Sequence, residues 1–210
     1  MATPPAVSTL LQPEDQARAA FYALLARLYA SSPGTSLLSA IASADELPTG
    51  ASTATGYALA QAWRELIGAS AAMDAEAIAV EYQDLFIGVG RSEISLYASA
   101  YMKSPGDTPL VAVRTALARL GLARHAGVNL YEDHLAAVCE TMRVLIAGAG
   151  ASADFTLAQQ RDFFFEHVRP WITSCCDVIN ANAVADYYRV VAQFTLCFMA
   201  IECDAMAIEH

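Results

Sequence analysis

The pair Asp133–His134 is the part of the sequence whose residue types most suggest chemistry, since histidine titrates near neutral pH. Adjacent residues on a helix point about 100° apart, so the two side chains do not form a simple dyad. Near a helix start, Asp133 can accept backbone N–H bonds while His134 turns toward the preceding loop. We favour this structural interpretation, an acidic first turn beside a half-buried histidine, over a catalytic one.

Other catalytic and metal-binding patterns are missing from the sequence. Helical di-iron proteins need Glu-x-x-His on two helices, and no histidine here follows a glutamate by three residues. No serine or cysteine lies in a nucleophile motif. The cysteines are odd in number and lack a Cys-x-x-Cys spacing, which indicates reduced thiols in a cytoplasmic protein. We therefore predict neither an enzyme nor a metal protein. The histidines are His125, His134, His167 and His210, and the cysteines are Cys139, Cys175, Cys176, Cys197 and Cys203.

Gly88-Val89-Gly90 is a weak candidate for a phosphate-binding loop. The glycines follow a predicted helix rather than a strand, and neither a Lys-Ser/Thr pair nor a third glycine completes a nucleotide motif. A helix terminator followed by a turn explains them without a ligand. We predict no resident cofactor.

The segment from Gly88 to Thr108 is the longest stretch without helical periodicity, and it contains Tyr97, Ser99 and Tyr101. A loop of this length inside a compact domain is often functional. Tyrosines are frequent binding anchors because each has a large apolar body with a polar tip. Tying the loop to the core is an equally good explanation of the same spacing. The segment is therefore a candidate binding loop.

Composition narrows the class of partner. The chain has 210 residues, is 56% hydrophobic and has a formal net charge of -10. Such a charge argues against nucleic acid, because few cations are available to neutralise phosphates. It is compatible with a basic partner, although acidity can also serve solubility alone. Neither a secretory signal nor an apolar run of membrane-spanning length occurs, so we predict a cytoplasmic protein without stable membrane insertion.

Helical periodicity runs through almost the whole chain, from about Pro13 to Cys203, and no segment alternates with a period of two. We predict an all-α domain of about nine to eleven helices over residues 13–210, after a flexible tail over residues 1–12. Proline and acidic residues at 13–15 favour a helix start.

Capping and breaker residues predict the helix boundaries in the C-terminal half of the chain. Asn129 can cap a helix, with Glu132 completing a capping box. Two separate helices are expected over residues 154–167 and 170–180, and a final helix over residues 183–203.

Four motifs in order resemble the TorD/DmsD/NarJ-type chaperones, which assist the maturation of molybdoenzymes in the cytoplasm. Residues 81–90 resemble the family's Glu-Tyr-x-x-Leu-Phe-x-Gly-Pro-Gly signature, and residues 96–101 its Pro-aromatic-x-Ser-x-aromatic segment. Residues 130–135 resemble its Glu-Pro-x-Asp-His-Leu/Ile hinge motif. Residues 165–171 match the His-x-x-Pro-Trp part of its Phe-x-x-x-His-x-x-Pro-Trp stretch. The resemblance extends over nearly the whole chain, from about residue 17 to residue 202.

The sequence departs from these motifs at three places. Val89 replaces the proline between the two glycines, and Leu96 replaces the proline before the aromatic residue. Leu130-Tyr131 stand where the hinge motif has Glu-Pro. A divergent branch with a different client would explain the altered hinge.

The resemblance implies an all-α chaperone of the TorD-like branch, with halves over residues 13–122 and 129–204 about a hinge. It would bind the twin-arginine leader of a molybdopterin oxidoreductase precursor and delay export until the cofactor is loaded. The expected peptide-binding residues are Tyr97, Ser99, Tyr101, Asp133 and His134, with Asp133 able to pair with a leader arginine. The expected supporting residues are Tyr82, Phe86, Gly88, Gly90, His167 and Trp171.

The sequence is compatible with two alternative functions. The resemblance allows weak guanine-nucleotide binding, although the missing lysine and strand argue against an NTPase. It also allows an assembly factor that binds the folded catalytic subunit, including that of a non-exported enzyme. A monomer and a homodimer are both compatible with the sequence.

Overall fold

The computed structural model describes residues 11–48, 53–88, 92–103, 108–125, 127–148 and 155–207, and these residues form helices without any strand. The tail predicted over residues 1–12 falls almost entirely outside them. Two π-helices, η1 (Gln83–Ile87) and η3 (Phe164–Val168), and one 3-10 turn, η2 (Ala98–Ala100), accompany the α-helices. The α-helices of the described residues are α1 (Pro13–Ala30), α2 (Thr35–Ala42), α3 (Ala54–Ala72), α4 (Ala75–Tyr82), α5 (Pro109–Arg119), α6 (Leu135–Ala147), α7 (Leu157–Phe163), α8 (Arg169–Ala181) and α9 (Tyr187–Ala207).

Side-chain caps and first-turn prolines fix several helix starts. Pro13 opens α1, as predicted. The Asp74 carboxylate accepts two backbone N–H groups at the start of α4, and Thr108 caps α5 ahead of Pro109. Thr156 forms a reciprocal capping box with Gln159 at the start of α7. These local bonds satisfy amides that have no partner within the helix.

The π-helices join segments that periodicity alone separates. α4 continues directly into η1, and α7 runs through η3 into α8, so the described α-helices form eight continuous helical segments. This is slightly fewer than the predicted nine to eleven. The two helices predicted over 154–167 and 170–180 are in fact one, because Pro170 lies in the first turn of α8, where its missing N–H is tolerated.

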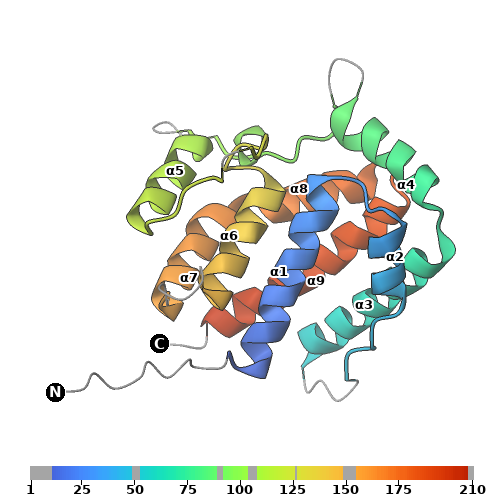
Figure 1. Ribbon diagram of the computed structural model, residues 1–210, viewed down its shortest axis with the longest axis horizontal. Coiled ribbons are helices and arrows are strands. Elements are labelled where there is room, and N and C mark those ends of the chain that lie inside the picture. The colour runs from blue at the N-terminus through green and yellow to red at the C-terminus, as the bar shows by residue number, and fades with distance from the viewer. Residues whose placement is uncertain are drawn as a thin grey trace.

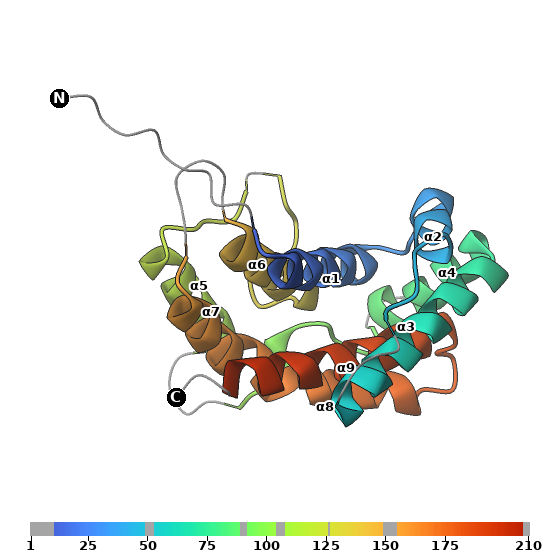
Figure 2. The ribbon, with the colours of Figure 1, turned by 90° about the horizontal axis from the view of Figure 1, so that it is seen from below.

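The helices stack in two layers. Figure 1 shows α1 and α6 side by side in front of α8 and α9, and the perpendicular view of Figure 2 separates the two layers. α3 packs along α9, and α2 packs on α3. The division of the chain into halves about a hinge stays a prediction.

A buried ion pair holds the two layers together. Glu202 on α9 has no solvent exposure, and its two carboxylate oxygens accept hydrogen bonds from Arg18 on α1 at 2.7 and 3.0 Å. The Tyr22 hydroxyl donates a third bond to the same carboxylate at 3.0 Å. This pairing compensates the buried charge of Glu202.

The core between α1, α3 and α9 is aromatic. Phe21 lies 5.2–5.4 Å from the rings of Trp63, Phe194 and Phe198. α9 is long and apolar enough to span a membrane by length and composition, and 44% of its most apolar window is buried within the protein. Because its aromatic side chains fill the core, we interpret α9 as the central helix of the fold.

The five cysteines have free thiols. Cys139, Cys175 and Cys176 are buried, while Cys197 and Cys203 are partly exposed. Burial raises the pKa of the Cys139 thiol above its usual range, because a thiolate would lose its hydration in the core. The buried cysteines therefore act as small apolar residues.

Candidate functional site

The loop motif and the hinge motif form one clasp. Tyr97 and His134 make an isolated antiparallel bridge. The Leu135 amide donates to the Leu96 carbonyl at 2.8 Å, and the Ala98 amide donates to the Asp133 carbonyl at 3.0 Å. Segments that are more than thirty residues apart in the chain are thus locked together by backbone pairing.

Asp133 uses its carboxylate inside this clasp. The residue is 2% exposed, and its Oδ2 atom accepts bonds from the amide of Ser99, at 3.2 Å, and from the Ser99 hydroxyl. It therefore caps the short turn η2, rather than the first turn of its own helix. The carboxylate does not face solvent, so pairing with a leader arginine would require the clasp to open.

His134 caps α6. Its Nδ1 accepts the Ala136 amide at 3.1 Å, and its ring meets the Tyr97 ring edge-to-face at 4.7 Å. Burial lowers the pKa of His134 to about 4, because the charged imidazolium would be desolvated. The predicted cap at Asn129 is wrong: α6 begins at Leu135, and Glu132 pairs with Arg114 instead of closing a capping box.

The two loop tyrosines have different environments. Tyr97 is partly exposed and lies 6.3 Å from the exposed ring of Tyr131. The Tyr101 hydroxyl donates to the Ser95 carbonyl at 2.8 Å, and its ring stacks on Trp171. Tyr101 therefore ties the loop to the core, while Tyr97 remains at the surface, beside exposed Ser99.

Trp171 and His167 anchor the far side of this loop. Trp171 is fully buried, and its indole N–H donates to the His167 carbonyl at 2.8 Å within the π-helical region. His167 is buried beside Phe163, and burial lowers its pKa. The structure brings both residues under the loop motif through Tyr101.

The residues of the first motif lie in the core at the start of α9. The Tyr82 and Phe86 rings pack on Tyr188, and the Tyr82 hydroxyl donates to the Tyr29 carbonyl at 3.2 Å. Gly88 has a φ of 66°, which suits glycine and ends η1. Gly90 lies outside the described residues.

Glu81 has a role that the sequence pattern did not reveal. Its buried carboxylate accepts the backbone amides of Asp186, Tyr187 and Tyr188 at 2.8–3.0 Å. These amides belong to the start of α9, so Glu81 caps a helix more than one hundred residues away. Only its place in the motif marked Glu81 beforehand.

An apolar groove of about 600 Å³ opens between α1, α6 and the segment that links α5 to α6. Its volume lies within the range of ligand-binding sites. Small alanines on α1 and α6 leave this space open, and such residues give no distinctive sequence signal. The groove is lined by Ala23, Ala26, Arg27 and Ala30 of α1, by Leu117 of α5, by Leu122, Ala123, Arg124, His125, Val128, Leu130 and Glu132 of the linking segment, and by Ala136, Ala137, Glu140, Thr141, Arg143 and Val144 of α6.

Of the two altered hinge residues, Leu130 lines this groove and Tyr131 does not. Leu130 is half-buried against the core and lines the groove. Tyr131 is 53% exposed on the surface, where the Arg114 guanidinium lies over its ring. The Glu132 carboxylate holds the wall through Arg114, at 3.0 Å, and Arg124, at 3.7 Å. The predicted site residues thus support the wall of a groove that they do not themselves line.

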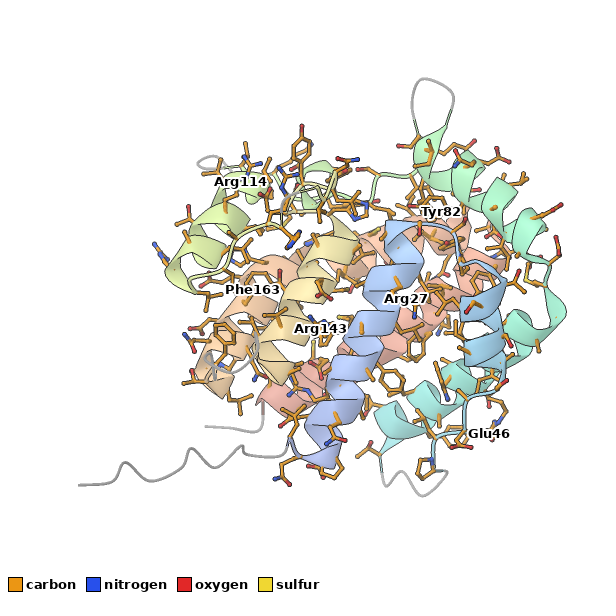
Figure 3. All side chains as sticks on the ribbon, in the orientation of Figure 1. Arg27, Glu46, Tyr82, Arg114, Arg143 and Phe163 are labelled. Atoms are coloured by element: carbon orange, nitrogen blue, oxygen red, sulfur yellow. The ribbon has the colours of Figure 1, made fainter. Side chains whose placement is uncertain are left out.

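Most charges at the groove are paired, with one exception. Arg143 makes two bonds to Glu140, at 2.6 and 2.8 Å, and Arg124 also donates to the Val128 carbonyl. Arg27 has no ion pair or hydrogen bond within the described part of the chain. Figure 3 labels Arg27 on α1 and Arg143 on the neighbouring α6.

The fold and the site define the class of protein: it is a helical protein with an apolar groove. Within the described residues, no group of three metal-ligating side chains lies together. The model of the nitrate reductase delta subunit family matches residues 52–177, more than half of the chain. The chain belongs to this family of NarJ/TorD-type chaperones, which confirms the predicted resemblance. It is accordingly a molybdoenzyme maturation chaperone rather than a member of an enzyme family.

No curated protein matches the chain. The family match ends before α9 and begins after α1, so it includes the α5–α6 side of the groove and leaves out the α1 side. The family comprises soluble cytoplasmic chaperones.

Proposed function

We propose that the protein holds the precursor of a molybdopterin oxidoreductase in the cytoplasm by binding the apolar part of its twin-arginine leader in the α1–α6 groove. Bound there, the leader is kept from the export machinery until the molybdenum cofactor is loaded. The observation that carries this proposal is the open apolar groove beside the hinge motif. The TorD-like branch is the one we assign.

Two physical terms support a peptide as the occupant. Apolar side chains of an extended or helical segment gain free energy by leaving water for a groove lined largely by Ala, Leu and Val. The net charge of -10 on the whole chain accelerates encounter with a leader that carries an arginine pair. Tyr97, Ser99 and Tyr101, with Asp133 and His134, act in this proposal mainly by holding the groove wall in place.

Isothermal titration of the full chain with a synthetic leader, taken from a molybdopterin oxidoreductase encoded beside it, tests the proposal. We expect a dissociation constant of about 1 µM or below. The variant Ala137→Trp, which fills the groove, should weaken binding at least about tenfold. Ala181→Trp on α8, exposed and outside the groove, is the matched control. Absence of heat with cognate leaders, while the chain is folded, would overturn the proposal.

The family description favours a second candidate, an assembly factor that binds the catalytic subunit itself, including a non-exported one. Pull-down of full-length and leaderless client separates the two. Equal capture of both forms would favour the assembly factor, whereas capture of the full-length form alone would favour leader binding.

We propose that no resident cofactor takes part. Gly88 ends a π-helix and does not join a strand to a helix, so it lacks the setting of a phosphate-binding loop. A titration with a fluorescent GTP analogue checks the weak nucleotide binding that the resemblance allows.

A further inference from the structure

The charges lining the groove have the opposite balance from the rest of the chain. The chain as a whole has 22 acidic and 12 basic residues. The groove is lined instead by three arginines and two glutamates, in addition to His125. A ligand in the groove therefore meets a local excess of positive charge, whereas the net charge of the whole chain is negative.

Both groove carboxylates are already paired. Glu140 binds Arg143, and Glu132 binds Arg114 and Arg124. Leu130 stands where the hinge motif of the resembling family has a glutamate, so this part of the wall offers apolar surface instead of a charge. Neither of the groove's acids is thus free to receive an arginine from a bound peptide.

Arg27 is the groove cation without a partner among the described residues, and it projects from the α1 wall, which the family match leaves out. A guanidinium beside apolar surface gains from a carboxylate, which it can bind through two parallel N–H···O bonds. It repels an arginine placed at the same point. Charge complementarity therefore favours an acidic group on the ligand.

We infer that the groove takes an apolar client segment that carries a carboxylate at its flank, and that Arg27 binds this carboxylate. The inference rests on the proposed function, because it names which part of the client the groove recognises. The arginine pair of a leader then lies outside the groove. Arg27 acts as a specificity-determining residue that the hinge and loop motifs do not contain.

Three peptides with the same Leu/Ala-rich core, and with glutamate, glutamine or arginine at the flank, test this inference. Fluorescence anisotropy with labelled peptides and the full chain gives their affinities. We expect the glutamate peptide to bind about threefold more tightly than the glutamine peptide, as for a partly exposed ion pair, with the arginine peptide weakest. Arg27→Gln should remove the order, and Arg27→Glu should reverse it.

Arg119→Gln is the matched control, since Arg119 is an exposed arginine on α5 that does not line the groove. It changes the net charge as Arg27→Gln does but should preserve the order of the peptides. Loss of the affinity order of the three peptides in both variants would overturn the inference. The net charge of the chain, and not a contact with Arg27, would then explain that order.

The groove-filling variant Ala137→Trp distinguishes the inference from the proposed function. If all three peptides bind equally and Ala137→Trp abolishes binding, the groove is the site and the role of Arg27 is wrong. If Ala137→Trp binds the peptides as tightly as the unmodified chain, both proposals are wrong. Ala123→Trp, at an exposed groove position, replaces Ala137→Trp should circular dichroism show that the latter is unfolded.

Discussion

At the scale of single residues, the clasp between loop and hinge is a set of buried polar groups that satisfy one another. Asp133 binds Ser99, and His134 binds the Ala136 amide. The sequence marked Asp133, His134 and Ser99 as important and allowed a structural explanation for the first two. It could not show that Asp133 caps a turn in another segment, because no local spacing encodes a contact across 34 positions.

The buried imidazole of His134 predicts a pH dependence of stability. Its pKa falls from 6.5 in the unfolded chain to about 4 in the folded one. Between these two pH values the unfolded state binds more protons than the folded state, so the free energy of unfolding rises with pH. The contribution of His134 to stability is therefore lost as the pH falls from 6.5 to 4. The full loss is about 3 kcal/mol. Urea denaturation at intervals across this window measures it.

His134→Asn retains a capping side chain and removes the titration. We expect its stability to vary less with pH across the same window than that of the unmodified chain. Some dependence remains in His134→Asn, since burial also lowers the pKa of His167. An unchanged slope in His134→Asn would show that His134 is not the titrating group.

At the scale of elements, apolar periodicity located the helices but not how they join. The stripes of α1, α3 and α6 appear in the sequence because each buries one face. The π-helices η1 and η3 could not be predicted, since a single turn with i→i+5 hydrogen bonds leaves little trace in a short apolar pattern. η1 lies within the first family motif, and η3 overlaps the last one.

Glu81 connects two such elements, and its removal should be costly. Three amides at the start of α9 lose their acceptor in Glu81→Ala, and they lie in or near the core. We expect a loss of about 2–3 kcal/mol in the free energy of unfolding, by urea denaturation. Glu65→Ala, at an exposed helical position, should change it by less than about 0.5 kcal/mol. Equal effects of the two substitutions would contradict the capping role.

At the scale of the whole molecule, the all-α class followed from composition and periodicity, whereas the groove did not. Its walls come from α1, α6 and the segment before α6, and their facing residues are mostly alanines. Alanine favours helix wherever it stands, so it does not reveal which face is left open. The groove depends on how α1 is held against α6 and α9, which is a property of the packed layers.

The Arg18–Glu202 pair is the ion pair that joins α1 to α9, and a double-mutant cycle tests its role. Glu202→Leu takes from the partly buried Arg18 guanidinium its buried partner and leaves it only Asp15 and Gln160, which should cost about 3 kcal/mol. Arg18→Met together with Glu202→Leu should cost clearly less, because neither charge of the pair then remains without the other. The Tyr22 hydroxyl loses its acceptor in both variants alike, so it does not contribute to the difference. Urea denaturation of the unmodified chain, the two single variants and the double variant gives the coupling energy. Additive losses would show that the two charges do not interact. Because α1 forms one wall of the groove, leader binding should weaken in Glu202→Leu more than in the double variant, at a temperature where both are folded.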